Sequence, residues 1–187
     1  YLIRPPKRAD ILSVFAGLRP LAAPKEGSTK TKEISRSHKV IVSKSKLITI
    51  TGGKWTTFRK MGEDTVDAHF KSQGISKIES TSAEKHLHGY SEKKIKGHLQ
   101  LYGIDAKFII ELQQKDPALA ERIHEKYPYT GAEVVWAVRE EMALKIEDFL
   151  SRRCRILLLD AKASMLMAPK VAAIMAKELG KDEAWIS

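Results

Sequence analysis

The chain has 187 residues, of which 43% are apolar, and a formal net charge of +10 at pH 7. This length suits one or two domains, and the single cysteine, Cys154, excludes a disulfide framework and a cysteine-based metal site. No apolar run reaches the length of a membrane span and no signal peptide is visible, so we expect a reduced, soluble, cytoplasmic protein. Because the first residue is Tyr1 rather than Met, we also expect a piece of a longer protein.

The excess positive charge lies in the first third of the chain. Residues 1–60 hold fourteen Lys and Arg against three acidic residues, whereas the remaining 127 residues hold nineteen against twenty. Charge segregated in this way favours contact with nucleic acid or another acidic surface, or a site for an anionic small molecule. The alternative is that some of these lysines only solvate loops and strand edges, which we expect for Lys25, Lys30, Lys32 and Lys44.

The first sixty residues have the pattern of short strands and loops. Residues 11–16 (ILSVFA) form an apolar run that ends at a Gly/Pro turn, and residues 22–33 form a polar loop. Residues 37–43 and 46–51 are predicted as consecutive strands of a hairpin. Because three short strands make a marginal sheet, we expect the other strands of that sheet to lie outside this chain.

A strand, a glycine turn and a helix follow one another in residues 47–67. Residues 47–51 are apolar and β-branched, Gly52 and Gly53 break the strand, and helical spacing of apolar residues begins at Trp55. The first N–H groups of such a helix have no internal partner, and Lys54 adds a positive charge beside them. The turn therefore suits an anion or an electron-rich heteroatom, although a simple tight turn is the alternative.

The second half of the chain is helical in character. Residues 71–89 are polar and are predicted as a linker between residues 1–70 and a helical domain of residues 90–187. Helices are predicted from Ser91, over 105–114, from Asp116-Pro117, over 130–143 behind a Thr130–Glu133 capping box, over 146–152, and over 160–179 with an interruption at Pro169. Val134, Val135, Val138 and Met142 are expected to form a buried stripe on the 130–143 helix. The fold class is thus α+β, with a short β segment followed by an all-α domain.

Two further groups of residues were considered as sites. The sequence points to no partner for any histidine, and no histidine pair has metal-ligand spacing, so these residues are expected at the surface: His38, His69, His86, His88, His98 and His124. The basic cluster 151–155 could bind an acidic partner or a membrane surface. We favour pairing of its arginines with nearby acids, namely Glu140, Glu141, Glu147 and Asp148.

Three cationic motifs lie at the edges of apolar runs in the basic third: GLRPL (17–21), SRSH (35–38) and GGKWTT (52–57). Guanidinium forks match phosphate oxygens, and an ammonium adds a point charge, so convergence of these motifs would bind a phosphate. Together with residues 133–164, they resemble the FAD-dependent glycerol-3-phosphate dehydrogenases and the related oxidases. The resemblance covers essentially the whole chain, which looks like the last third of such an enzyme.

The resemblance implies an incomplete FAD- and substrate-binding domain in residues 1–70. It also implies specific site residues. The substrate, mainly its phosphate, would be held by Arg19, Arg36 and Lys54, and the flavin ring would be contacted by Gly52, Gly53, Lys54, Trp55 and Thr56. For Trp55 a purely packing role is the alternative. No catalytic residue and no metal site is expected within this chain.

The implied activity is oxidation of sn-glycerol 3-phosphate to dihydroxyacetone phosphate by hydride transfer to FAD, with electrons passed on to the quinone pool or oxygen. The resemblance also implies peripheral attachment to the inner face of the cell membrane, admits a homodimer, and implies no nucleic-acid partner. Because no GxGxxG fingerprint is present, we expect the chain alone neither to retain FAD nor to be active. The alternative from another class is a non-catalytic basic module that binds nucleic acid or a protein partner.

Overall fold

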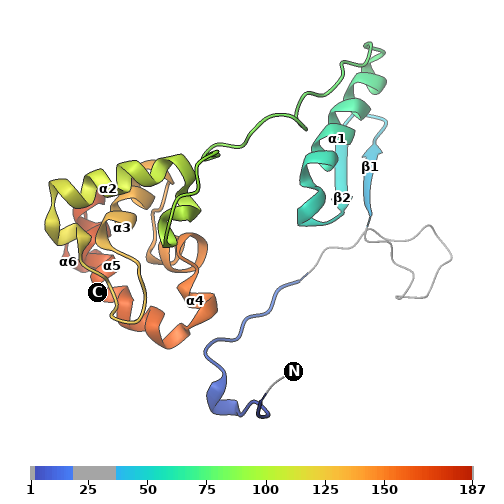
Figure 1. Cartoon of the computed structure of the whole chain (residues 1–187). Coiled ribbons are helices and arrows are strands. Elements are labelled where there is room, and N and C mark those ends of the chain that lie inside the picture. Colours follow the sequence, from blue (N-terminus) through green and yellow to red (C-terminus); the bar gives the residue numbers. More distant parts are fainter. Residues whose placement is uncertain (1–2, 19–36, 187) are drawn as a thin grey trace. The chain divides into compact units, whose positions relative to one another are not determined.

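The computed structural model describes residues 3–18 and 37–186 (Figure 1). Contacts divide the chain into two units, each considered by itself. The first, called here the helical unit, contains residues 88–186 together with the described part of residues 1–16. The second, the hairpin unit, runs from Gly17 to Leu87. The fold class is therefore the expected one, a small β segment followed by a helical C-terminal part.

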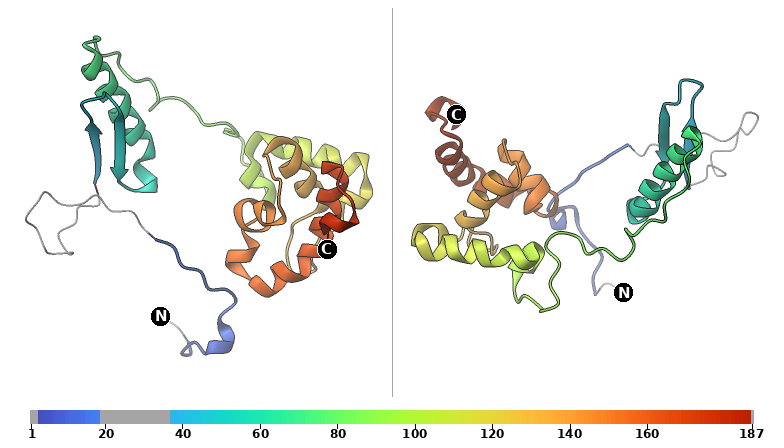
Figure 2. Two further views of the ribbon diagram at one scale, coloured as in Figure 1. Left: turned by 180° about the vertical axis from the view of Figure 1, so that it is seen from behind. Right: turned by 90° about the horizontal axis from the view of Figure 1, so that it is seen from above.

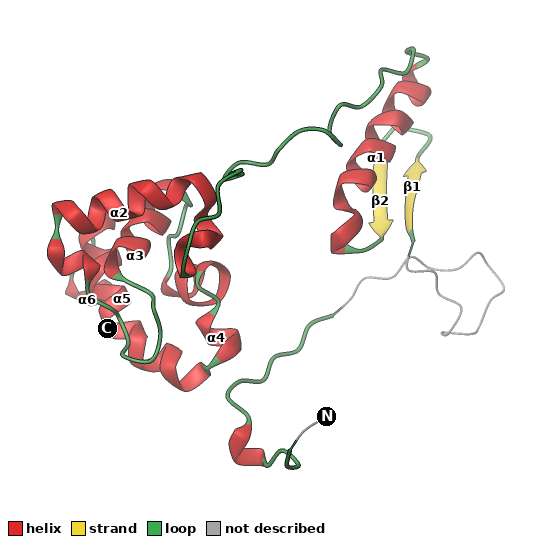
Figure 3. Cartoon of the chain, in the orientation of Figure 1, coloured by secondary structure: helices red, strands yellow, loops and turns green. Residues whose placement is uncertain are grey.

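The hairpin unit consists of two strands and one long helix. Strands β1 (His38–Val42) and β2 (Ile48–Gly52) are antiparallel, with Val40 opposite Ile50. A 3₁₀ turn (η3, Trp55–Thr57) leads into helix α1 (Phe58–Gln73), which lies alongside the hairpin (Figure 3). Helix α1 ends at Gly74, whose φ of 67° is a left-handed cap suited to glycine. The predicted hairpin and the helix after the glycine turn are both confirmed.

The hairpin unit has no core of its own. None of its described residues is fully buried, and apolar side chains such as Ile41 and Leu47 are exposed. This follows from its size, because one helix on a two-stranded sheet can cover only one face and leaves the other open. The uncovered apolar surface agrees with the expectation that this sheet belongs to a larger one.

Residues 11–16 do not form the expected strand. Apart from a 3₁₀ turn (η1, Arg8–Asp10), the described residues 3–18 have no helix or strand, and Val14 and Phe15 are 82% and 71% exposed. A strand needs a partner for its backbone N–H and C=O groups, and no described segment pairs with this one. The apolar pattern therefore predicted neither burial nor strand pairing within the described part of the chain.

The helical unit holds all the fully buried residues of the described chain. Its elements are η4 (His98–Asp105), α2 (Ala106–Lys115), η5 (Pro117–Ala120), α3 (Gly131–Glu140), a π-helical turn η6 (Asp148–Arg153), α4 (Ile156–Leu159), α5 (Ala161–Leu179) and α6 (Glu183–Ile186). Figure 2 shows these helices packed on one another. The core gathers Phe149, Ile156, Met167, Val171 and Met175.

Several helix predictions need correction. No helix begins at Ser91, whose hydroxyl donates to the Lys93 carbonyl in an irregular segment bounded by Gly89 and Gly97, both with positive φ. Helix α3 ends at Glu140, so Met142, with φ of 57° and 80% exposed, is not on the buried stripe. Pro169 does not interrupt α5, which continues to its left-handed cap at Gly180.

Asp160 begins α5. Its carboxylate accepts hydrogen bonds from the Ala163 amide at 3.0 Å, the Tyr127 hydroxyl at 2.8 Å and the Lys126 ammonium at 3.0 Å. These donors, the amide first, hold the pKa of the Asp160 carboxyl well below its usual range. The N-cap thus joins the loop before α3 to the start of the longest helix.

Candidate functional site

The glycine turn ends β2 and begins the helix that follows. Gly52 and Gly53 have φ of 76° and 83°, a left-handed conformation that a side chain would strain. Lys54 is extended, and the Thr57 hydroxyl donates to the Lys54 carbonyl at 2.9 Å and accepts its N–H at 3.3 Å. The chain therefore passes directly from the tight turn into the N-terminus of the η3–α1 helix.

Gly53 also brings three elements into close contact. A Cβ atom on this residue would lie 2.6 Å from the sulfur of Met61 on α1 and 3.2 Å from the Cβ atom of His38 on β1. Both distances are below ordinary van der Waals separation, so only glycine fits without displacement. The GGK turn and the histidine of the SRSH motif, which are separate motifs in the sequence, are neighbours in the structure.

His38 has a carboxylate partner that the sequence did not reveal. Its Nε2 atom lies 2.7 Å from Oδ2 of Asp64 on α1, and Lys60 lies 2.9 Å from the other oxygen of Asp64. Lys60 first, and His38 second, lower the pKa of Asp64. His38 is thus a half-buried tie between β1 and α1 rather than the expected surface residue. The sequence did hold one signal of this pairing, namely an acidic residue, Asp64, on the helix that packs against the hairpin.

The predicted flavin contacts surround the exposed end of this helix. Lys54, Trp55 and Thr56 are exposed, Trp55 to 88%, and the Trp55 ring lies 6.0 Å from that of Phe58. The first helical amides, which have no intrahelical acceptor, lie at the same end as the Lys54 ammonium group. This arrangement can hold an anion or the carbonyl oxygens of a heterocycle. Arg19 and Arg36 lie outside the described residues, so their convergence with Lys54 stays a prediction.

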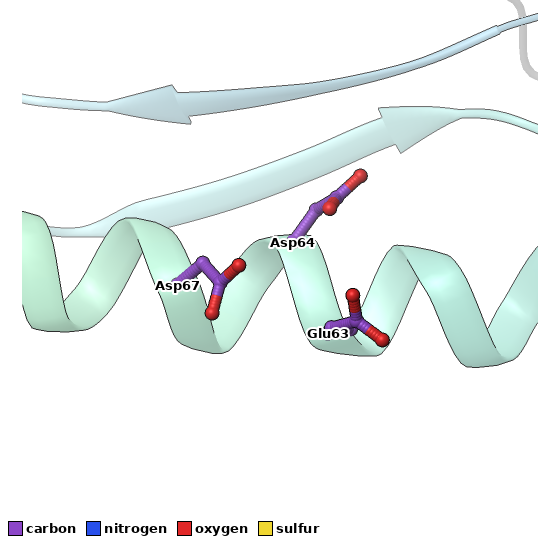
Figure 4. A group of neighbouring side chains, drawn as sticks. All are labelled: Glu63, Asp64 and Asp67. Atoms are coloured by element: carbon purple, nitrogen blue, oxygen red, sulfur yellow. The ribbon is translucent and has the colours of Figure 1, made fainter. Parts of the chain in front are cut away.

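Three acidic side chains on α1 lie close together (Figure 4): Glu63, Asp64 and Asp67, with one ligand oxygen of each within 4.8 Å of the others. Each already has a cationic partner. Lys60 lies 2.7 Å from Glu63, and Lys77 lies 3.1 Å from Asp67. The contacts with Glu63 and then Asp64 raise the pKa of Lys60, so its charge is retained. Because each carboxylate already has a lysine as its counter-ion, we assign no metal ion to this group.

A hollow with a largely apolar lining lies along α1 in the hairpin unit. It has a volume of about 540 Å³ and is lined by α1 residues including Phe58, Val66 and Phe70, and by residues 78–82. Of the predicted flavin and substrate residues that the structure describes, namely residues 52–56, none lines it. It marks the uncovered side of α1, in keeping with the absence of a core in this unit.

A buried carboxylate organises one side of the helical unit. Glu133, fully buried, accepts hydrogen bonds from the Thr130 amide at 2.8 Å and the Tyr102 hydroxyl at 3.2 Å, and lies 3.0 Å from Nε2 of His98. The predicted Thr130–Glu133 capping box is confirmed. His98, like His88 with its 2.6 Å contact to Asp105, has a partner that the sequence did not suggest.

The basic cluster 151–155 is largely neutralised. As expected, Arg152 lies 2.7 Å from Asp148 and 3.3 Å from Glu147, and Arg153 lies 3.6 Å from Glu141. Among the described residues, neither Arg155 nor the expected partner Glu140 takes part in an ion pair. Burial raises the pKa of Glu141, and Arg153 opposes this rise. A cavity of about 320 Å³ beside these side chains is lined by both arginines together with their neighbours on η4 and α3.

Within the part of the chain that is described, no helix is long and apolar enough to cross a membrane.

Comparison with known proteins supports the resemblance. Residues 43–185 match the family model described as the C-terminal domain of alpha-glycerophosphate oxidase. The chain is 31% identical to a mitochondrial glycerol-3-phosphate dehydrogenase of Bos taurus, over 95% of this chain and 27% of that protein. A probable mitochondrial glycerol-3-phosphate dehydrogenase of Caenorhabditis elegans is 34% identical over 93% of this chain and 27% of its own length. A mitochondrial glycerol-3-phosphate dehydrogenase of Arabidopsis thaliana is 32% identical over 92% and 32%, respectively. The chain therefore spans only about a third, or less, of the length of these curated relatives.

Proposed function

Because the chain belongs to the family of the C-terminal domain of alpha-glycerophosphate oxidase, we propose that it is the C-terminal part of a flavoenzyme that oxidises sn-glycerol 3-phosphate to dihydroxyacetone phosphate. The relatives named as glycerol-3-phosphate dehydrogenases support this substrate. On the same resemblance we assign the electrons to a quinone or to oxygen, and we expect association with a membrane surface rather than insertion into it.

The observation that carries the proposal is the GGK turn against the N-terminus of the η3–α1 helix. Two left-handed glycines turn the chain into the helix, whose first amides have no intrahelical acceptor and form a positive end together with the exposed Lys54. A flavin ring fits such an end because its pyrimidine oxygens are acceptors that gain negative charge on reduction. Gly52, Gly53, Lys54, Trp55 and Thr56 would hold that side of the ring. When bound, FAD supplies the acceptor for the hydride that leaves C2 of the substrate.

Substrate binding is assigned to the three cationic residues of the basic third. Arg19 and Arg36 would contact the phosphate as bidentate forks, and Lys54 would add a point charge and orient the substrate beside the glycine turn. His38 follows Arg36 by two residues and is tied to α1 through Asp64. We propose that this contact fixes the first residue of β1, and so the point at which the segment with Arg36 joins the strand.

The chain by itself is not expected to act as the enzyme. The hairpin unit has no fully buried residue among those described, and the sequence lacks the glycine fingerprint that binds the FAD pyrophosphate. The nucleic-acid or protein-binding alternative has less support. The turn offers hydrogen-bond donors for the acceptor oxygens of a flavin, whereas part of the positive charge is already paired, as with Lys60 and Glu63.

Substitution of the cationic residues in the full-length protein tests the proposal. Arg19→Ala should raise KM for glycerol 3-phosphate at least tenfold and leave FAD content unchanged, because it removes an assigned phosphate contact and none of the assigned flavin contacts. Lys54→Ala should raise KM and also weaken FAD retention. Lys44→Ala, an exposed lysine in the hairpin loop, is the matched control. Unchanged kinetics for Arg19→Ala would remove the phosphate role from this residue.

A further inference from the structure

A hollow of about 360 Å³ lies within the helical unit, where the irregular segment of residues 89–97 meets η4. Two lysines of the segment, Lys93 and Lys94, line this hollow, together with Gln100 on η4 and the backbone of Gly89 and Gly103. We call it the lysine pocket. Its volume is within the range of small-molecule sites, about 300–1,000 Å³. None of the residues assigned to the substrate or the flavin lines it.

Two glycines hold the backbone of the lysine pocket together. The amide of Ile104 donates to the Gly89 carbonyl at 3.0 Å, and so joins the two ends of residues 89–104. Gly103 has a φ of 55°, and a Cβ atom on it would collide with the carbonyl group of Gly89. Any larger residue at position 103 would therefore force the two segments apart. The close approach of two backbone segments thus shapes the pocket.

The lysine pocket carries positive charge without a counter-ion. Lys93 and Lys94 are exposed, and neither ammonium group belongs to an ion pair within the described residues. None of the described residues that line the pocket is acidic. Residues 89–97 contain three lysines against one acidic residue, Glu92, which does not line the pocket, so the segment has a net charge of +2.

The nearby acidic residues already have cationic partners. A second hollow, of about 260 Å³, shares part of the lining of the lysine pocket and is also lined by Asp105 and Glu141. Asp105 lies 2.6 Å from Nε2 of His88, and Glu141 lies 3.6 Å from Arg153. These contacts leave the two lysine ammonium groups to an anion from outside the chain.

The donors of the lysine pocket match a phosphate group. Two ammonium groups supply point charges, and the side-chain amide of Gln100 adds a neutral donor. The hydroxyl of Ser91 donates to the Lys93 carbonyl at 2.8 Å and so orders the main chain between them. A carboxylate ligand would be matched better by the planar fork of an arginine, which this pocket does not have.

We propose that the lysine pocket binds a phosphate group, either of a free phosphate ester or of a phospholipid headgroup. This site belongs to the helical unit alone and is separate from the assigned substrate phosphate contacts. It does not depend on the proposed oxidation of glycerol 3-phosphate, and it gives the helical unit a binding role of its own.

The test is the rate at which acetic anhydride acetylates individual lysines of the full-length protein, followed by mass spectrometry. The probes are inorganic phosphate, and phosphatidylcholine vesicles with and without phosphatidylglycerol, each compared with sodium chloride at equal ionic strength. Acetylation of Lys93 and Lys94 should slow about threefold once about two thirds of the pockets are filled. Lys115, an exposed lysine at the end of α2 that lines neither hollow, is the matched control and should keep its rate.

The probes distinguish the two sources of phosphate. Protection by inorganic phosphate assigns the pocket to a free phosphate ester, whereas protection only by vesicles that contain phosphatidylglycerol assigns it to a lipid headgroup. In either case Lys93→Gln should remove most of the protection of Lys94, because the two ammonium groups share one phosphate. Lys115→Gln should leave that protection intact.

The proposal fails if no probe protects Lys93 and Lys94, or if sodium chloride or the control Lys115 shows the same change. Full protection of Lys94 in Lys93→Gln would also refute a shared phosphate. Because lysine acetylation is measured without turnover, this result is independent of whether the protein oxidises glycerol 3-phosphate.

Discussion

Replacing Gly53 by alanine probes the turn on which the flavin assignment depends. The new Cβ atom would meet the sulfur of Met61 at 2.6 Å and the Cβ atom of His38 at 3.2 Å, in a backbone conformation with φ of 83°. Met61 can swing its flexible end aside, but the Cβ atom of His38 moves only with β1. The substitution therefore strains the backbone and displaces the turn from the strand.

The cost can be estimated against a control on the same helix. A left-handed conformation costs an L-residue roughly 1–2 kcal/mol, before any displacement of His38 is counted. Gly62→Ala introduces the same methyl group within α1, where no atom lies within 4 Å, and should stabilise the helix by about 0.5–1 kcal/mol. The two alanine variants should thus differ by about 1.5–3 kcal/mol in the free energy of unfolding.

Urea unfolding and flavin absorbance of the full-length protein provide the assay. Gly53→Ala should lower the urea midpoint and the fraction of protein that retains flavin, whereas Gly62→Ala should match or exceed the wild type in both. Equal midpoints and equal flavin content in the two variants would refute the assigned packing of Gly53 and its link to the cofactor.

Three further predictions concern the helical unit. Because its folded pKa is lowered, Asp160 stabilises the fold above its unfolded pKa near 4, so the deficit of Asp160→Asn in urea unfolding should be full at pH 7 and shrink steadily as the pH falls below about 4; a deficit at pH 2 as large as that at pH 7 would contradict this. Burial raises the pKa of the Cys154 thiol to about 12, so a thiol reagent at pH 8 should label it slowly unless the protein is unfolded, and rapid native labelling would show an accessible thiol. Glu133→Gln should cost about 1–3 kcal/mol in unfolding free energy because a buried acceptor is replaced by a donor, whereas the control Glu140→Gln should cost almost nothing, and equal stabilities would rule out the buried network.

Sequence reasoning succeeded where the signal was local. The end of the 160–179 helix at Gly180 and the Thr130–Glu133 capping box depend on residues a few positions apart, and each lies where the pattern indicated. The GGK turn is equally local, because two glycines after a β-branched run define it. The resemblance to the flavoenzyme family, which added the chemistry of the site, depends on the order of such short motifs.

It failed where a partner distant in sequence decides the structure. The run at residues 11–16 is apolar enough for a strand, but no described segment pairs with it, and its contacts are instead with α4 and α5. His38 and His98 are paired with acids 26 and 35 residues away, which spacing alone does not show. Met142 interrupts its apolar stripe through a positive φ that composition does not encode.

The most direct test of the account is the visible spectrum of the full-length protein before and after anaerobic addition of glycerol 3-phosphate. We expect a yellow protein, larger than this chain, whose flavin absorption bleaches when the substrate is added. A colourless protein, or a flavin that the substrate leaves oxidised, would contradict the assignment of this chain to a glycerol-3-phosphate-oxidising flavoenzyme.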